Sequence, residues 1–155
     1  MTTLHVGDTA PQFTAPTDGN GHFSIPNTAG KNIILYFYPK DNTSGCTKEA
    51  IAFNENLPAF EAANTQIIGL SKDSVTKHDK FKEKYALTFP LVSDESTEVC
   101  QAYNTWVEKS MYGRQYMGIE RSTFLIDHKG VIQKIWRKVK VKEHVEEVLK
   151  EAQSL

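Results

Sequence analysis

The sequence is poor in cysteine, clustered histidine and long hydrophobic runs, and each shortage excludes a class of protein. Its 155 residues include two cysteines, Cys46 and Cys100, which are too few for a secreted disulfide framework. No stretch approaches the roughly 18 apolar residues of a membrane-spanning helix. The five histidines are scattered singly, without the histidine and cysteine spacing of a zinc site. We therefore expect no membrane partner, no metal and no organic cofactor.

Charge and composition exclude further classes. A formal net charge of -1 with 39% hydrophobic residues gives no electrostatic reason to bind nucleic acid or an anionic membrane. The first residues lack the basic and apolar segments of a secretory signal, so we expect a cytoplasmic location. No repeat or linker interrupts the chain, which predicts one domain over residues 1–155. A monomer is the default expectation, with a dimer as the alternative.

Hydrophobic spacing predicts strands that alternate with helices in the first half of the chain. Turn-forming residues at 18–21 indicate a small N-terminal hairpin within residues 12–25, and we expect its role to be peripheral. Residues 33–38 are continuously apolar, as in a central parallel strand that is covered on both faces. Helical spacing then runs from Cys46 to about residue 63, with a kink or restart expected at Pro58.

The second half continues this alternation. It predicts strands at 66–70 and 89–92, a helix at 75–85 capped by Ser74, a helix near 95–103, a hairpin of 123–127 with 131–139, and a closing helix at about 142–152. Together these elements predict an α/β protein with a thioredoxin-like fold, in which a central mixed sheet carries helices on both faces.

Residues 104–118 have no clear periodicity, and we expect them to form the longest loop. Trp106, Tyr112, Tyr116 and Met117 in this segment either line the functional pocket or belong to the core or an interface.

The segment from Pro39 to Cys46 carries the most chemical information, because it joins the first core strand to a helix. Loops at the carboxyl ends of parallel strands are where α/β proteins usually place their sites. A cysteine in the first helical turn faces unpaired N–H groups, which favour the thiolate. A thiolate can cleave a peroxide if donors stabilise the departing oxygen. Thr43 and the N–H of Cys46 are candidate donors, and Pro39 is a candidate pocket wall.

A permanent cation would stabilise both the thiolate and the leaving oxygen. The sequence has three arginines, Arg114, Arg121 and Arg137. Arg121 is the best candidate, because it opens the expected strand 121–127, whose start is able to reach the sheet edge near the helix that begins at Cys46.

Three segments, YFYPKDNTSGCTKEA, LVSDESTEVCQAYNTW and GIERSTFLID, resemble a peroxiredoxin of the bacterioferritin-comigratory (PrxQ) subfamily. The resemblance covers nearly the whole chain and matches the P-x-x-x-T-x-x-C signature at Pro39, Thr43 and Cys46. It implies a thioredoxin-like fold, reduction of hydrogen peroxide and organic hydroperoxides through a sulfenic acid on Cys46, and recycling by a thiol reductant. It also implies that Arg121 is the family's arginine and that Glu49 assists it.

The chain departs from this family in two places. Many members have T-P-G-C where this chain has T-S-G-C, and the lost proline removes no catalytic group. The subfamily often places its resolving cysteine five residues after the first, where this chain has Ile51. We therefore expect a one-cysteine cycle, in which an external thiol such as thioredoxin, glutaredoxin or a low-molecular-weight thiol reduces the sulfenic acid.

Other interpretations stay open at this point. Cys100 is expected to be a packed core residue, but it is also the candidate resolving thiol of a two-cysteine cycle. The chain is alternatively a peroxide sensor or a holdase-like interaction protein that uses Cys46 as a switch. A dithiol oxidoreductase is disfavoured, because the sequence has no Cys-x-x-Cys.

Overall fold

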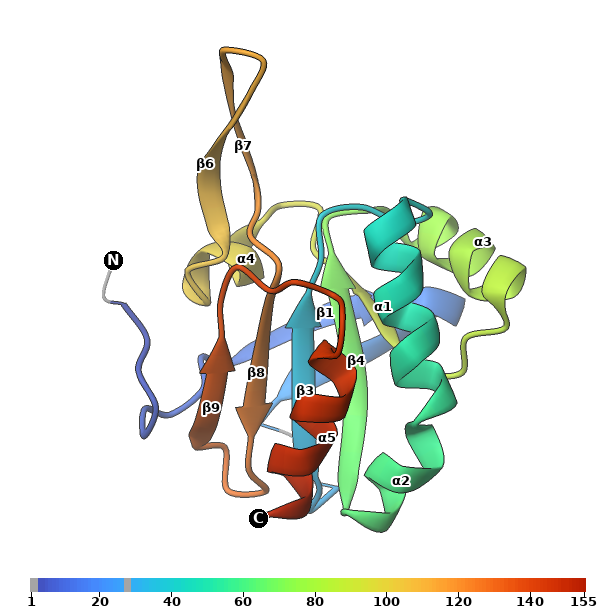
Figure 1. The fold of residues 1–155 in the computed structure, drawn as a ribbon, viewed down its shortest axis with the longest axis vertical. Coiled ribbons are helices and arrows are strands. Elements are labelled where there is room, and N and C mark those ends of the chain that lie inside the picture. Colours follow the sequence, from blue (N-terminus) through green and yellow to red (C-terminus); the bar gives the residue numbers. More distant parts are fainter. Residues whose placement is uncertain (1–2, 27–28) are drawn as a thin grey trace.

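The computed structural model describes residues 3–26 and 29–155 and is organised around one mixed sheet (Figure 1). This seven-stranded sheet has the order β2-β1-β5-β4-β3-β8-β9. Three neighbouring strands run parallel, namely β3 (Asn32–Phe37), β4 (Thr65–Ser71) and β5 (Leu91–Ser93). On the other side of β3 two antiparallel strands follow, β8 (Ser122–Ile126) and β9 (Ile132–Trp136). The predicted central mixed sheet is confirmed.

The predicted N-terminal hairpin is also present, but it is part of the main sheet. It consists of β1 (Phe13–Thr17) and β2 (Gly21–Ile25), joined by a single 3-10 turn at Asp18–Asn20. Thr17 of β1 pairs with Val92 of β5, so the hairpin extends the sheet at one edge. The predicted N-terminal hairpin is therefore confirmed, and it forms one edge of the main sheet.

The helices begin and end close to the residues that the hydrophobic spacing indicated. They are α1 (Ser44–Glu55), α2 (Leu57–Ala62), α3 (Val75–Tyr85), α4 (Glu98–Ala102) and α5 (His144–Gln153). Pro58 stands in the first turn of α2, where its missing N–H costs nothing, and this explains the restart. The hydroxyl of Ser74 accepts the N–H of Lys77 at 3.2 Å and caps α3 as expected. No helix in the described part of the chain is long and apolar enough to cross a bilayer.

Two hydrophobic layers cover the two faces of the sheet. Alternate residues of β3 point to opposite sides, so Ile34 and Tyr36 join one layer while Ile33 and Leu35 join the other. The first layer receives apolar side chains from α1, α2, α3 and α5, and the second receives them from α4 and the N-terminal hairpin. The prediction of helices on both faces is thus confirmed.

The segment 104–118 is not a loop, and that prediction was wrong. It forms a second, two-stranded sheet of β6 (Trp106–Met111) and β7 (Arg114–Ile119), which projects from the body of the molecule (Figure 1). Tyr112 and Gly113, the two turn residues, both have positive φ, as tight hairpins require. The strands escaped detection because neither of their faces is apolar along its length. Tyr112, Tyr116 and Met117 are exposed, so they do not belong to the core. Trp106 is partly buried and packs against the core.

Candidate active site around Cys46

The loop that leads to Cys46, residues 39–45, is here called the cysteine loop. It follows β3 and crosses the end of the sheet to α1 (Figure 1). Asn42 in this loop adopts a left-handed conformation with φ of 61°, which asparagine tolerates better than most residues. Thr43 returns to an extended conformation and serves as the N-cap, but its side chain does not cap the helix. Cys46 is then the third residue of α1, where backbone N–H groups lack intrahelical partners.

The structure brings Cys46, Glu49 and Arg121 together. Arg121 Nη2 lies 3.3 Å from the sulfur of Cys46, and Nη1 lies 2.6 Å from Oε1 of Glu49. Glu49 shares a face with Cys46, because it follows one helical turn later. Arg121 directly precedes β8, whose first residue Ser122 pairs with Phe37 at the end of β3. This pairing puts the start of β8 beside the start of α1, as the sequence predicted for Arg121.

Gly45 makes this close approach of Arg121 possible, and the sequence reasoning missed it. A Cβ atom at Gly45 would lie 3.2 Å from Arg121 Nη2, which is tighter than most contacts of real Cβ atoms. A side chain here would therefore push the guanidinium away from Cys46. The available signal was a glycine inside the first turn of a helix, where glycine is otherwise unfavourable.

Burial sets the electrostatics of the site. The side chain of Glu49 is fully buried, and this desolvation raises its pKa to about 7, against the attraction of the Arg121 charge. Desolvation works against the charge of Arg121 as well, but the nearby Glu49 and Cys46 outweigh it and raise the pKa of Arg121. Arg121 is therefore a permanent cation whose guanidinium divides between a carboxylate and the cysteine sulfur. The second carboxylate oxygen of Glu49 is buried and has no hydrogen-bond partner among the described residues.

Two further side chains belong to the surroundings of Cys46 without having been predicted. Tyr36 lies under the site, stacked on Phe53 with 4.6 Å between ring centroids. Burial, followed by the charges of Glu49 and Cys46, raises its pKa, so Tyr36 is neutral. Lys109 of β6 lies close enough for Arg121 to add to the effect of burial and lower the pKa of Lys109. Tyr36 was hidden in an apolar strand pattern, and Lys109 in the segment expected to be a loop.

Pro39 and Thr43 lie in the cysteine loop, as the sequence requires. Pro39 is half-buried and Thr43 is exposed. The hydroxyl of Thr43 donates to the carbonyl oxygen of Lys40 at 2.9 Å, so in this conformation its proton is directed to the loop itself. The oxygen of this hydroxyl can still accept a hydrogen bond. The role of Thr43 as a donor to substrate stays a prediction.

Cys100 lies far from this constellation in the fold. It belongs to the hydrophobic layer on the opposite face of the sheet from Cys46, and both cysteines are free thiols. Burial, and then the charge of Asp94, raise the pKa of the Cys100 thiol well above its ordinary value. The packing role expected for Cys100 therefore agrees with its surroundings.

One group of side chains in the described residues has donor atoms close enough to share a metal ion, namely Asp41, Asp73 and His78. These atoms are instead engaged with protein groups. His78 Nδ1 lies 2.6 Å from Asp41, and its Nε2 lies 2.9 Å from the carbonyl oxygen of Val92. Asp73 accepts the backbone N–H of Asp41 and the hydroxyl of Ser71. The group forms a buried polar network, and a metal would have to replace its hydrogen bonds.

Comparison with known proteins identifies relatives of this chain. Residues 6–135 match the model of the AhpC/TSA family. The chain is 50% identical over 146 residues to a putative peroxiredoxin bcp of Coxiella burnetii, covering 94% of this chain and 97% of that protein. It is 47% identical over 147 residues to peroxiredoxin Bcp of Bacillus subtilis, covering 95% of this chain and 94% of that protein.

Solved structures of such relatives have the same fold. A cysteine-to-serine mutant of PrxQ from Xylella fastidiosa superposes with a TM-score of 0.93 at 40% identity, covering 99% of this chain and 98% of that one. The bacterioferritin comigratory protein of Xanthomonas campestris superposes with a TM-score of 0.87 at 43% identity, covering 92% of this chain and 90% of that one. That structure is described as giving insight into alkyl peroxide reduction.

Proposed function

Because this chain belongs to the AhpC/TSA family and is a thiol-dependent peroxidase of the peroxiredoxin type, we propose that Cys46 is its peroxide-attacking residue. The observation that carries the proposal is the 3.3 Å contact between Arg121 Nη2 and the sulfur of Cys46. A guanidinium at this distance stabilises negative charge on sulfur, and the thiolate is the nucleophilic form of cysteine.

In the proposed reaction the Cys46 thiolate attacks the terminal oxygen of a hydroperoxide. A sulfur–oxygen bond forms, the oxygen–oxygen bond breaks, and the departing oxygen leaves with the electron pair and takes up a proton. Arg121 and the N–H of Cys46 stabilise the negative charge on this oxygen, and Thr43 helps to hold the substrate. Pro39 shields the resulting sulfenic acid. Glu49 holds the guanidinium in place through its 2.6 Å contact.

We infer a one-cysteine cycle for the return of Cys46 to its thiol. Ile51 stands where the subfamily often has a resolving cysteine, and Cys100 lies behind the sheet. An external thiol therefore condenses with the sulfenic acid, releasing water and forming a mixed disulfide. A second thiol then releases Cys46 and carries away the disulfide. Thioredoxin, glutaredoxin and low-molecular-weight thiols are the candidate reductants.

The substrate range and the cellular setting are further parts of the proposal. Hydrogen peroxide and organic hydroperoxides are the proposed substrates, and the Xanthomonas relative described for alkyl peroxide reduction supports the organic class. We propose that the chain works as a single domain and a monomer. The cytoplasm is the proposed location, because a reducing compartment keeps Cys46 and Cys100 as thiols.

The test is to treat the reduced protein with one equivalent of hydrogen peroxide and to map both cysteines by peptide mass spectrometry. We expect a dimedone-trappable sulfenic acid on Cys46, with Cys100 still reduced. A disulfide between Cys46 and Cys100 would replace the one-cysteine cycle by a two-cysteine cycle. An unreacted Cys46 would overturn its assignment as the peroxide-attacking residue.

A further inference from the structure

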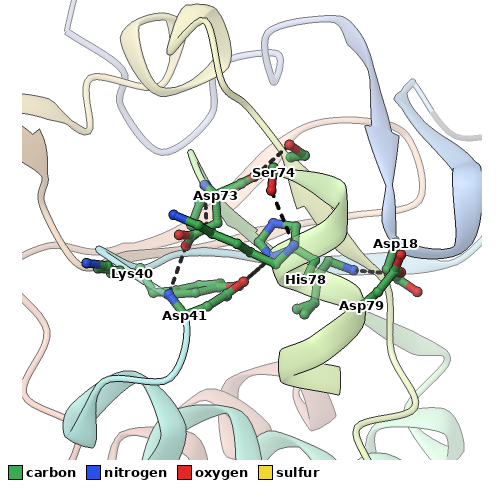
Figure 2. A network of polar contacts seen from close by, with 12 residues as sticks. Asp18, Lys40, Asp41, Asp73, Ser74, His78 and Asp79 are labelled. Atoms are coloured by element: carbon green, nitrogen blue, oxygen red, sulfur yellow. Dashed lines mark hydrogen bonds and ion pairs between the residues drawn. The ribbon is translucent and has the colours of Figure 1, made fainter. Parts of the chain in front are cut away.

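A buried polar network lies under the cysteine loop and involves none of the residues assigned to the reaction. Figure 2 shows Asp41 of the loop and Asp73 beside His78 of α3. The side chain of Asp41 is held at both oxygens, because the Tyr38 hydroxyl donates to Oδ1 at 2.5 Å and His78 Nδ1 lies 2.6 Å from Oδ2. The backbone N–H of Asp41 donates to Asp73 at 2.8 Å. The loop is thus tied down through both the side chain and the backbone of Asp41.

The hydrogen bonds define the charge of His78. Its Nε2 lies 2.9 Å from the carbonyl oxygen of Val92, which only accepts, so Nε2 carries a proton. Its Nδ1 faces a carboxylate oxygen of Asp41 that needs a donor, so Nδ1 carries a proton too. The side chain of His78 is completely buried, and burial alone would oppose this charge. The bond and charge of Asp41, aided by Val92 and Asp73, outweigh burial and raise the pKa of His78.

Asn42, the residue after Asp41 in the cysteine loop, is also held by α3. The side-chain oxygen of Asn42 accepts the hydroxyl of Tyr85 at 2.9 Å and the ammonium of Lys84 at 3.2 Å. Asn42 also has the left-handed conformation that turns the chain toward α1. Contacts to α3 therefore set the position of the first turn of α1, whereas Arg121 stands directly before β8, on the other side of β3 from β4. The meeting of Cys46 with Arg121 depends on both anchorages.

We propose that His78, paired with Asp41, is a positioning residue for the peroxidase reaction. His78 fixes the cysteine loop and so holds Cys46 against Arg121. This inference rests on the proposed function of Cys46. His78 touches neither Cys46 nor Arg121 through any hydrogen bond or ion pair of the described residues. Its influence on the reaction is exerted through the loop.

The pairing has a definite pH dependence. The titratable groups that face His78 from other elements are Tyr38, Asp41 and Asp73. Burial raises the pKa of Tyr38, which stays neutral. An open pocket of about 380 Å³ reaches Asp41 and Asp73, and four lysines line it: Lys40, Lys77, Lys80 and Lys84. Because the pKa of His78 is raised, its pairing is complete below the ordinary value of about 6.5 and is lost as the pH rises through the raised value.

Two replacements of His78 separate its two hydrogen bonds. In His78→Asn the side-chain amide stands near the position of Nδ1 and donates to Asp41 without a proton that titrates. In His78→Gln the amide stands near Nε2 and keeps the bond to Val92 but loses Asp41. We expect peroxide to oxidise Cys46 about tenfold more slowly in His78→Gln at pH 7, because small misplacements of reacting groups are costly. His78→Asn should retain most of the rate.

The pH profile distinguishes positioning from a merely structural role. The ratio of the wild-type rate to the His78→Gln rate should be constant below pH 6.5 and should approach one as the pH rises. The oxidation rate of His78→Asn, once corrected for thiolate formation, should not change with pH over the same range. His144→Gln is the matched control, since it also removes a buried histidine. Burial lowers the pKa of His144 to about 4, so it is neutral, and it bonds Thr123 rather than the cysteine loop.

Amide hydrogen exchange of the reduced protein tests the same inference without peroxide. Exchange over residues 40–47 should be faster in His78→Gln and unchanged in His144→Gln, with β6 and β7 as an internal reference. Wild-type exchange over 40–47, together with a wild-type rate and pH profile in His78→Gln, would overturn the inference. If His78→Gln does not fold, the rate and pH profile of His78→Asn decide. If wild-type Cys46 does not react with peroxide, the proposed function fails, and hydrogen exchange still decides whether His78 fixes the loop.

Discussion

The two cysteines occupy nearly the same local position and yet have opposite surroundings. Cys46 is the third residue of α1 and Cys100 is the third residue of α4. Both are buried, with exposed fractions of 1% and 0%. By helix position and burial alone, the two thiols would have similar chemistry.

Their neighbours make the difference. The N–H of Cys100 donates to Asp94 at 2.8 Å, and that of Val99 donates to the same carboxylate at 3.2 Å, so an acid occupies the start of α4. At Cys46 the charged group in contact is the Arg121 guanidinium, which lies 3.3 Å from the sulfur. A cation beside the sulfur favours a thiolate, whereas a nearby carboxylate disfavours it. The two cysteines therefore differ in the charge that tertiary contact brings to them, a cation at Cys46 and an acid at Cys100.

The largest expected effect comes from removing each sulfur in turn. Cys46→Ser should lower peroxide consumption to the uncatalysed background, because a serine hydroxyl is not ionised at neutral pH and does not attack peroxide. Cys100→Ser should retain most of the activity. Peroxide consumption in the presence of excess dithiothreitol measures both variants. Turnover that persists in Cys46→Ser would contradict the contrast between the two cysteines.

The second test removes the cation that distinguishes Cys46. Arg121→Gln should slow the oxidation of Cys46 by about 10²–10³-fold, the usual cost of losing one donor to a developing negative charge. Stopped-flow measurement of oxidation by hydrogen peroxide gives this rate. Arg114→Gln, in the exposed hairpin, is the matched control and should stay within about a factor of two of wild type. Equal rates in the two variants would mean that the contact of Arg121 with sulfur has no role in the reaction.

The third test uses pH to separate the surroundings of Cys46 from those of Cys100. Burial raises the pKa of Glu49 from 4.5 to about 7, so native Glu49 holds its proton more tightly than unfolded Glu49 does. Its stabilisation is complete below pH 4.5 and is lost as the pH rises through 7. Glu49→Gln mimics the protonated form and does not titrate. The unfolding free energy of Glu49→Gln minus that of wild type should therefore rise by about 3 kcal/mol when the pH rises from 4.5 to 7.5.

Urea denaturation of wild type and Glu49→Gln at both pH values measures this difference. Lys109→Gln and Cys100→Ser serve as controls, because neither removes a carboxylate that titrates in this range. A difference in unfolding free energy that does not change with pH would show that folding does not raise the pKa of Glu49.

The smallest expected effect concerns the acid at Cys100. Asp94→Ala removes the acceptor of two N–H groups at the start of α4 and should lower the unfolding free energy by about 1–2 kcal/mol. Ser96→Ala, which loses an exposed 3.3 Å hydrogen bond in the same segment, should cost less than about 0.5 kcal/mol. Denaturation midpoints measure both, and the oxidation rate of Cys46 should not change. A slower oxidation in Asp94→Ala would couple the two faces of the sheet.

Much of the fold was predictable because its signals are local. The apolar run of β3, the restart at Pro58 and the cap at Ser74 each depend on a few neighbouring residues, and all three are confirmed. The hairpin of β6 and β7 was missed, because both of its faces are largely exposed and its hydrophobic pattern has no period. The predicted single domain and the predicted roles of the site residues Pro39, Thr43, Cys46, Glu49 and Arg121 stay predictions.

The residues of the candidate site also divide into those with a signal in the sequence and those without one. Cys46 and Arg121 were identified from their place beside a strand and from the resemblance to a family. Gly45 and the pairing of Asp41 with His78 were not, because their importance arises from contacts with residues distant in the sequence. Asp41 and His78 are 37 residues apart, and nothing in the local pattern of either indicates the other.

The sequence by itself determined that a strand ends in a loop and a helix with Cys46 in its first turn, and that Ile51 leaves this helix without a second thiol. Only the tertiary structure decided that Arg121, 75 residues further along, meets Cys46 and that Cys100 lies behind the sheet. The reason is physical. Helix starts and apolar runs are encoded within a few residues, whereas the position of a charged group depends on strand pairing, here of Phe37 with Ser122.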